Sequence, residues 1–220
     1  MDLNQTLPVN FFRRQDETPD AEFYHQPRFV THIDDRAIAA VTQLYREYFR
    51  PNTDLLDLMS SWVSHLPAEM PFRRVVGLGM NAAELRANPR LTEHAVQDLN
   101  QQPTLPFADN AFDGAAICVS IDYLTQPVAV LRELARVLRP DAPLVITFSN
   151  RCFPSKAIAA WHALDDQGHL ALVQQFLTVA GGWHAVELFD RSPLPPGRSD
   201  PLLAVVARVA PKGTILQEHS

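Results

Sequence analysis

Three side chains near the start of the sequence could do chemistry: Tyr24, Arg28 and His32. A histidine can take a proton from a reacting group near neutral pH, and an arginine can bind a carboxylate through paired hydrogen bonds. The same segment is also compatible with a surface stretch that is merely pinned by Tyr24 and Phe29. These three residues are therefore weak catalytic candidates.

Polar residues also stand where predicted strands end. Asp98 ends a strand at the carboxyl edge of the predicted sheet, where open α/β sheets bind ligands. Its alternative role is an aspartate that caps a turn or helix. Arg151 follows a later strand and could bind an anionic acceptor, unless its loop only leads to a helix capped by Ser155.

Several chemistries are not indicated. His162 and His169 are seven positions apart and lack the close pairing typical of a zinc site, so no metal is expected. There is no G-x-S-x-G motif and no cysteine-centred nucleophile. The two cysteines, Cys118 and Cys152, are expected to be reduced core residues.

Net charge and hydropathy limit the classes of partner that the protein could bind. The net charge of −6 argues against a general grip on nucleic acid, which requires a basic face. No apolar run approaches the ~18 residues of a membrane span, and residues 1–17 do not resemble a signal peptide. We expect a soluble, cytoplasmic protein that acts on a small molecule; the oligomeric state is not indicated.

Apolar runs alternate with helical patterns from Asp54 onward. The strand candidates are Leu55–Met59, Arg74–Leu78, Ala95–Asp98, Phe112–Val119, Leu144–Phe148, His184–Phe189 and Leu202–Val209. The clearest helices are Arg36–Phe49, Pro127–Leu138 and a region from Ser155 to Ala180 that Asp165-Asp166 divides. Expected caps are Asp34 or Asp35 and Thr125, with Gly181-Gly182 as a stop.

This alternation predicts an α/β fold: a doubly wound, seven-stranded, mostly parallel sheet with helices on both faces. The last two strands have no helix between them, so they form an antiparallel hairpin at the sheet edge. Residues 1–35 are expected to be an N-terminal extension that covers the pocket, with a mobile or extended tail over residues 1–20. Residues 36–210 form the domain, and residues 211–220 form a C-terminal tail.

A set of spaced motifs resembles the type-11 domain of class I S-adenosylmethionine-dependent methyltransferases. The motifs are Asp98-Leu99-Asn100, then Leu105-Pro106-Phe107 leading to Asp113, then Tyr123-Leu124, then Glu133 to Pro140 (ELARVLRP). They follow the family pattern in order over roughly residues 54–149. The resemblance implies a Rossmann-like methyltransferase fold.

The resemblance also implies an S-adenosylmethionine pocket. The residues that it places there are Asp57, Met59, Ser60, Ser61, Gly79, Met80, Asn81, Asp98, Leu99 and Ser120. The family loop D-x-G-x-G-x-G corresponds to Asp57–Val63, and Met59, Ser61 and Val63 replace its three glycines. Glycines let the backbone approach the cofactor without a Cβ clash.

The acid that binds the ribose in the family is also missing, because Gly79 stands in its place. Gly77-Leu78-Gly79 lies about 20 residues after Asp57 and so belongs to the second strand. Asn81 or Glu84 could replace the acid. If the pocket is merely weakened, an aspartate at position 79 is expected to strengthen cofactor binding; an unchanged affinity would indicate that Asn81 or Glu84 has taken over or that the ribose lies elsewhere. Ser60 and Ser61 could bind the cofactor or only cap a first helix, on which His65 would face the pocket or simply pack.

Two functions follow. The first is an S-adenosylmethionine-dependent methyltransferase with a modified pocket, acting on a small molecule. The alternative is a non-catalytic relative that has lost cofactor binding and serves as a binding or partner module. A nicotinamide oxidoreductase is disfavoured because no G-x-G-x-x-G follows a strand.

Overall fold

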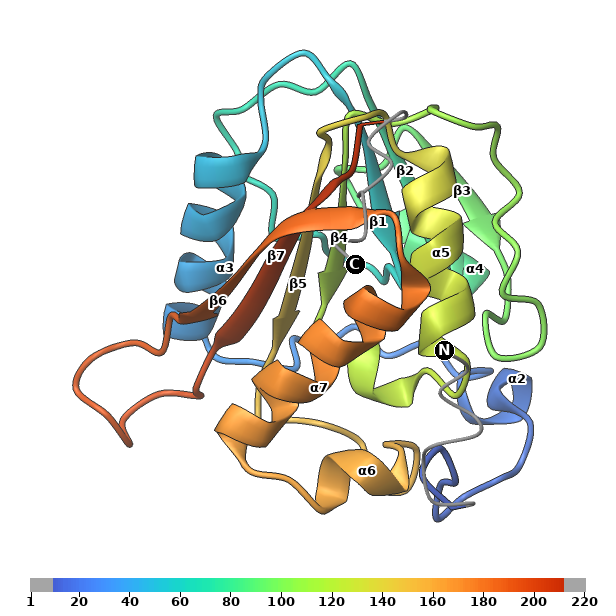
Figure 1. The fold of residues 1–220 in the computed structure, drawn as a ribbon, viewed down its shortest axis with the longest axis vertical. Helices are drawn as coiled ribbons and strands as arrows, with labels where there is room; N and C mark the ends of the chain where they lie inside the picture. Colours follow the sequence, from blue (N-terminus) through green and yellow to red (C-terminus); the bar gives the residue numbers. More distant parts are fainter. Residues whose placement is uncertain (1–9, 212–220) are drawn as a thin grey trace, which may run out of the picture.

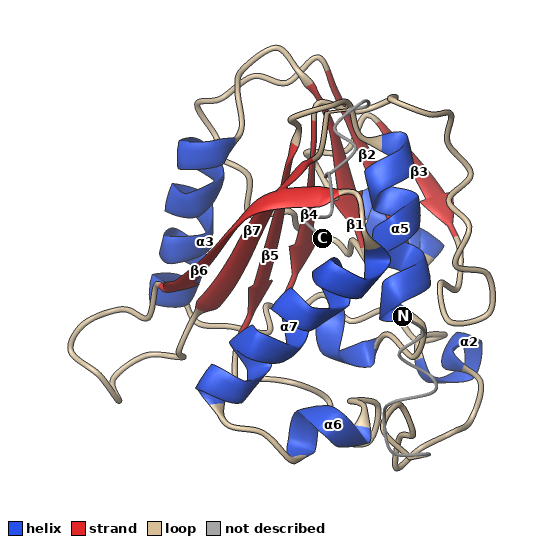
Figure 2. Cartoon of the chain, viewed as in Figure 1, coloured by secondary structure: helices blue, strands red, loops and turns tan. Residues whose placement is uncertain are grey.

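The computed structural model describes residues 10–211, which form seven strands in one sheet (Figures 1 and 2). The strands are β1 (Asp54–Leu58), β2 (Arg74–Gly79), β3 (Glu93–Val96), β4 (Gly114–Cys118), β5 (Pro143–Phe148), β6 (Trp183–Asp190) and β7 (Leu203–Val209). Their order across the sheet is β3-β2-β1-β4-β5-β7-β6. The first five run parallel, while β7 is antiparallel to both β5 and β6. The predicted fold class, including the edge hairpin, is confirmed.

The helices form a layer on each face of the sheet (Figure 1). They are α2 (Asp20–Phe23), α3 (Asp35–Tyr48), α4 (Ala82–Ala87), η1 (Ile121–Tyr123), α5 (Pro127–Val137), α6 (Ala159–His162) and α7 (Asp166–Ala180). One apolar cluster joins α5 and α7 to the sheet, and a second joins α3 to the opposite face. Because both faces are covered, the strands β1, β2, β4 and β5 are almost entirely buried, as parallel strands usually are. No helix within residues 10–211 is long and apolar enough to cross a membrane.

Most predicted helix ends are confirmed, and two predicted caps are wrong. The Asp34 side chain accepts hydrogen bonds from two backbone N–H groups at the start of α3, and Asp165 caps α7. Gly181 ends α7 with a φ of 70°, which favours glycine. Thr125 does not cap α5, because its hydroxyl donates to Asn100 instead. Ser155 does not cap α6, which begins only at Ala159.

The helix expected after β1 is absent, and residues 59–73 form an irregular loop. The hydroxyls of Ser60 and Ser64 both donate to Asp57 at 2.6 Å, so the side chains tie the loop back to the strand. Serine hydroxyls that bond locally in this way compete with helix formation. Pro67 and Pro71 further disfavour a helix. The prediction that Ser60 or Ser61 caps a first helix is therefore wrong.

The N-terminal segment is packed from residue 10 onward. Of the two predicted forms of the tail, mobile or extended, residues 10–20 are therefore not the mobile one; residues 1–9 lie outside the described residues. The backbone N–H groups of Ala159 and Ala160 donate to the carbonyls of Arg13 and Phe11. Lys156 is fully buried beneath the segment. Its ammonium group donates to the Thr18 carbonyl at 2.7 Å and lies 3.3 Å from carboxylate oxygens of both Asp16 and Asp20. Nearly all of the expected C-terminal tail likewise falls beyond the described residues.

Candidate functional site

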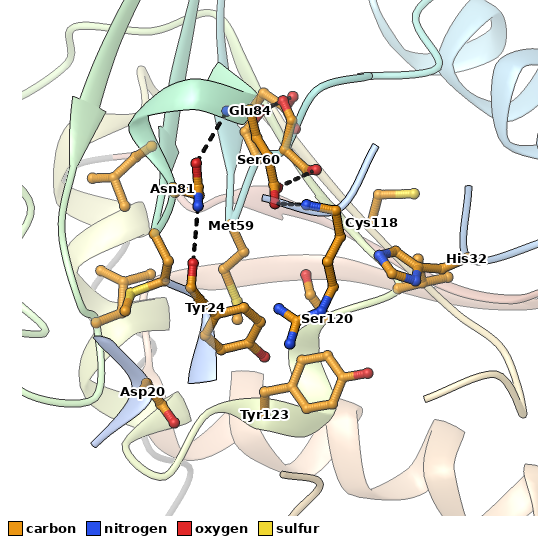
Figure 3. A pocket seen from close by; sticks show the side chains of 18 of the residues that line it. Asp20, Tyr24, His32, Met59, Ser60, Asn81, Glu84, Cys118, Ser120 and Tyr123 are labelled. Atoms are coloured by element: carbon orange, nitrogen blue, oxygen red, sulfur yellow. Dashed lines mark hydrogen bonds between the residues drawn. The ribbon is translucent and has the colours of Figure 1, made fainter. Parts of the chain in front are cut away.

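A pocket opens at the carboxyl ends of β1, β2 and β4, under the segment from Asp20 to His32 (Figure 3). Its empty volume is about 1170 Å³ when the part open to solvent is included. All thirteen predicted site residues line it: Tyr24, Arg28, His32, Asp57, Met59, Ser60, Ser61, Gly79, Met80, Asn81, Asp98, Leu99 and Ser120. In Figure 3, Glu84 and Ser60 lie at the upper end of the pocket, and Asp20 and Tyr123 lie at the lower end. The structure thus brings these residues together, while their roles stay predictions.

Asp57 is held by its own loop. Its Oδ2 accepts the hydroxyls of Ser60 and Ser64, and Asn88 in turn donates to the Ser64 hydroxyl at 2.8 Å. Burial raises the pKa of Asp57 to about 6, although the two hydroxyl hydrogen bonds oppose this shift. Asp57 therefore shapes the loop that follows β1, and one of its two oxygens is already occupied.

The loop keeps a glycine-like backbone without glycine. Met59 stands at the first glycine position of the family loop and has a φ of 57°, in the left-handed region that side chains rarely adopt. His65, further along the same loop, has a φ of 52°. The loop therefore turns at Met59 as glycine would allow, but it carries a long thioether into the pocket wall.

Gly79 is required by close packing against this loop. The Ser60 N–H donates to the Leu78 carbonyl at 2.8 Å, which draws the loop over the end of β2. A Cβ atom added at Gly79 would lie 2.1 Å from the Ser60 carbonyl oxygen. Backbone therefore already fills the space that an aspartate side chain at position 79 would enter, which argues against the expectation that this substitution would strengthen cofactor binding.

The two residues considered as replacements for the ribose acid hold the N-terminal segment. The Asn81 side chain caps α4 and donates to the carbonyls of Tyr24 and His25. Glu84 accepts the Arg28 backbone N–H at 2.7 Å through Oε1, and it accepts the Ser61 hydroxyl at 2.7 Å through Oε2. Both side chains line the pocket, but each already has partners within the protein.

The side of the pocket next to β3 and β4 has polar atoms that form no hydrogen bond within residues 10–211. Asp98 lines the pocket and accepts the N–H groups of Asn100 and Gln101 through Oδ1, so its turn-capping role is real; within residues 10–211 its Oδ2 forms no hydrogen bond. Leu99 is buried beside it. The hydroxyl of Ser120 is buried and has no hydrogen-bond partner within residues 10–211.

The N-terminal candidates face the same pocket. Phe153 lies beneath them, with its ring centroid 6.5 Å from that of Tyr24 and 5.2 Å from that of His32. Burial, followed by the nearby Asp20 and Asp122 carboxylates, raises the pKa of Tyr24, so its hydroxyl stays protonated. Partial burial lowers the pKa of His32, which is consequently neutral near pH 7.

Sequence reasoning missed three residues that shape the site. Lys156 and Phe153 anchor the segment that covers the pocket, and Trp62 donates its indole N–H to the Val30 carbonyl at 3.0 Å. A lysine followed directly by the apolar run of residues 157–161 was a visible signal of burial. Nothing in the sequence indicated that Trp62 contacts a segment thirty residues earlier.

Other predicted candidates lie elsewhere. Arg151 does not line the pocket and lies 3.6 Å from Asp200. The His169 ring stacks on Trp161 in the core, and His162 lies 2.7 Å from the Pro154 carbonyl oxygen. Both cysteines are free. His65 does line the pocket, and burial followed by the neighbouring His32 lowers its pKa.

Comparison with known proteins agrees with this arrangement. Residues 60–146 match a protein family described as a methyltransferase domain. A stretch of 63 residues is 41% identical to an O-methyltransferase of Pyrenophora dematioidea; it makes up 27% of this chain and 24% of that protein. The match therefore spans about a quarter of that relative's length.

Solved structures share the fold at low sequence identity. One is a chain from the complex between the Haloferax volcanii Trm112 methyltransferase activator and a methyltransferase, with a TM-score of 0.62 and 16% identity over 80% of this chain and 91% of the other. Another is the [4+2]-cyclase SpnF, with a TM-score of 0.56 and 17% identity over 77% of this chain and 80% of the other. With the family match, they confirm the predicted resemblance to a class I methyltransferase.

Proposed function

We propose that this chain, which has the fold of the class I S-adenosylmethionine-dependent methyltransferases, binds S-adenosylmethionine and methylates a small-molecule acceptor. The observation that carries the proposal is the pocket itself. It lies at the carboxyl ends of β1, β2 and β4 and combines an open Asp98 oxygen with an unpartnered Ser120 hydroxyl. Open α/β sheets bind ligands at this edge.

The residues present fit the cofactor on one side of the pocket better than on the other. Asp98 and Leu99 would hold the adenosine part, since they offer a free carboxylate oxygen beside a buried apolar side chain. On the other side, Met59 supplies a left-handed turn at the first glycine position of the family loop. When bound, the cofactor supplies a methyl group that is activated by a positively charged sulfur.

The chain's own residues supply the setting for transfer. His32 and His65 line the pocket, and burial lowers the pKa of each, so both imidazoles are neutral near pH 7. A neutral imidazole can take the proton that a hydroxyl or amine acceptor loses when it is methylated. The segment from Asp20 to His32 limits the access of water, because Asn81, Glu84 and Lys156 hold it over the pocket.

One observation favours the alternative, a methyltransferase-like protein that no longer binds the cofactor. The Ser60 carbonyl occupies the space next to Gly79 where the family places its ribose-binding acid. Asn81 and Glu84 both bond to the N-terminal segment, so neither is free to replace that acid without new contacts. Such a protein would keep the fold as a binding or partner module.

Calorimetric titration with S-adenosylmethionine and S-adenosylhomocysteine separates the two functions. Methyltransferase function predicts binding in the micromolar range and a higher thermal midpoint with ligand. A Ser120→Ala variant removes the hydroxyl without adding bulk to this buried position and should bind more weakly. Thr178→Val, which removes an exposed hydroxyl on α7, a helix that contributes no residue to the pocket lining, serves as the control. Absence of heat and of thermal stabilisation at millimolar ligand would favour the binding module.

A further inference from the structure

We infer that Arg28 forms a carboxylate-binding subsite in this pocket. The inference names a binding subsite within the pocket of the proposed function. It rests on that function if the bound carboxylate belongs to the cofactor. Arg28 lies in the segment that covers the pocket and lines its interior. Its Nη1 is buried and has no hydrogen-bond partner among residues 10–211. A charged donor in that position is suited to receive an anionic oxygen.

The rest of the guanidinium group is held in place. Nη2 donates to the Phe23 carbonyl at 2.9 Å. The central carbon lies 4.5 Å from the ring centroid of Phe23, 5.3 Å from that of Phe153 and 5.7 Å from that of Tyr24. These cation–π contacts fix the plane of the group before any ligand arrives. The free nitrogen is therefore preorganised rather than mobile.

The charges around Arg28 leave its positive charge available. Among the described residues that line the pocket, Arg28 is the only arginine or lysine. Asp20 is already paired with Arg14 and Lys156. Glu84 accepts the backbone N–H of Arg28, and no carboxylate within residues 10–211 forms a salt bridge with its guanidinium group.

A carboxylate fits this site better than a phosphate. Phosphate sites usually combine several backbone N–H groups with one or more cations. Here a single guanidinium group shares the pocket lining with the rings of Tyr24, Tyr123 and Phe153, and its buried Nη1 has no hydrogen-bond partner within residues 10–211. Figure 3 shows Tyr24 and Tyr123 beside each other at this end of the pocket. A planar carboxylate next to an apolar or aromatic group matches that combination.

The carboxylate could come from the aminocarboxypropyl part of the cofactor or from the acceptor. Calorimetry with S-adenosylhomocysteine and 5′-methylthioadenosine tests the first source, because the second compound lacks the carboxylate. Fluorine NMR with 4-fluorobenzoate tests the second source, with neutral 4-fluorobenzamide for comparison. Wild type, Arg28→Gln and Arg86→Gln are compared; Arg86 lies on the exposed end of α4 and serves as the control.

If the cofactor supplies the carboxylate, Arg28→Gln weakens the binding of S-adenosylhomocysteine about 10- to 100-fold and leaves the affinity for 5′-methylthioadenosine unchanged. If the acceptor supplies it, the variant binds both nucleosides like wild type but loses the line broadening of 4-fluorobenzoate. Wild type should bind the carboxylate compound of the relevant pair more tightly than its neutral counterpart: S-adenosylhomocysteine over 5′-methylthioadenosine, or 4-fluorobenzoate over 4-fluorobenzamide. This preference is measured on wild type alone, so it can be tested even if the variant does not fold.

The inference is overturned if wild type shows neither preference, or if Arg28→Gln changes neither nucleoside nor benzoate binding. Failure of the proposed function looks different. Wild type would then bind neither S-adenosylmethionine nor S-adenosylhomocysteine, and the benzoate measurement alone would still decide whether Arg28 binds carboxylates.

Discussion

The two sides of the pocket differ in how far the protein satisfies its own polar groups. On the β1–β2 side, Asp57 binds two serine hydroxyls and the Ser60 carbonyl packs against Gly79. On the β3–β4 side, Asp98 keeps an open oxygen and Ser120 keeps an unpartnered hydroxyl. The first side is built to hold a loop and the second is left able to bind a ligand. A sheet can thus keep its strand order while one of its binding loops is rebuilt.

The largest expected effect comes from filling the space at Gly79. Gly79→Ala should destabilise the fold by about 3 kcal/mol, since the new Cβ would meet the Ser60 carbonyl and strained packing is costly. Gly79→Asp should be at least as harmful and should not improve cofactor binding. Chemical denaturation measures both.

Gly197→Ala is the matched control for Gly79. It has a φ of 78° and nothing within 4 Å of an added Cβ, so it should cost only about 1 kcal/mol for the left-handed backbone. Equal costs at the two positions would show that the loop after β1 moves freely away from β2.

The second effect concerns the anchor beneath the N-terminal segment. Lys156→Met should cost about 3 kcal/mol, because Asp16 loses its ion pair with Lys156 and the buried Asp20 keeps only Arg14. Hydrogen exchange in residues 10–32 should accelerate together with the loss of stability. Arg46→Met removes an exposed pair with Glu69 and should cost less than about 1 kcal/mol. Unchanged exchange in residues 10–32 would mean that other contacts hold the segment.

The third effect is a pH dependence on the β1–β2 side. Burial raises the pKa of Asp57 from 3.8 to about 6, so the native state binds more protons than the unfolded state between these values. Stability from this group is therefore lost as the pH rises from about 4 to about 6, by about 3 kcal/mol in total.

Asp57→Asn should remove this slope, and denaturation at a series of pH values from 4 to 7 measures it. The difference between variant and wild type isolates Asp57, because Asp122, whose pKa burial raises to about 8, contributes to both proteins. A difference that stays constant over this range would show that the carboxyl titrates normally.

The sequence predicted the sheet well because strand and helix periods are local signals. Continuous apolar runs marked β1, β2 and β5 to within one residue at either end. Spacing of apolar residues marked α3 and α5 in the same way. The strand β3 was placed two residues too late, since its exposed edge gives little apolar pattern.

The sequence predicted which residues line the site but not which atoms they contact. The family motifs identified the strand ends that form the pocket, and parallel topology brings those ends together. The contact between the Ser60 carbonyl and Gly79 was not foreseen, because it depends on where a loop without regular structure lies. The same holds for Asn81 and Glu84, whose partners are fifty-six and fifty-seven positions away in sequence.

The smallest effect tests the comparison between the two sides directly. Asp98→Asn keeps the Oδ1 acceptor that caps the turn and replaces the charged Oδ2 acceptor with an NH2 group that cannot accept a hydrogen bond. It should weaken the binding of S-adenosylhomocysteine at least about 10-fold, the usual cost of losing one charged hydrogen bond. Asp57→Asn should change the same affinity less than about 3-fold, because Asp57 already binds two hydroxyls of its own loop. Calorimetry on both variants decides the matter: a larger loss for Asp57 would place the cofactor on the β1–β2 side and reverse the comparison.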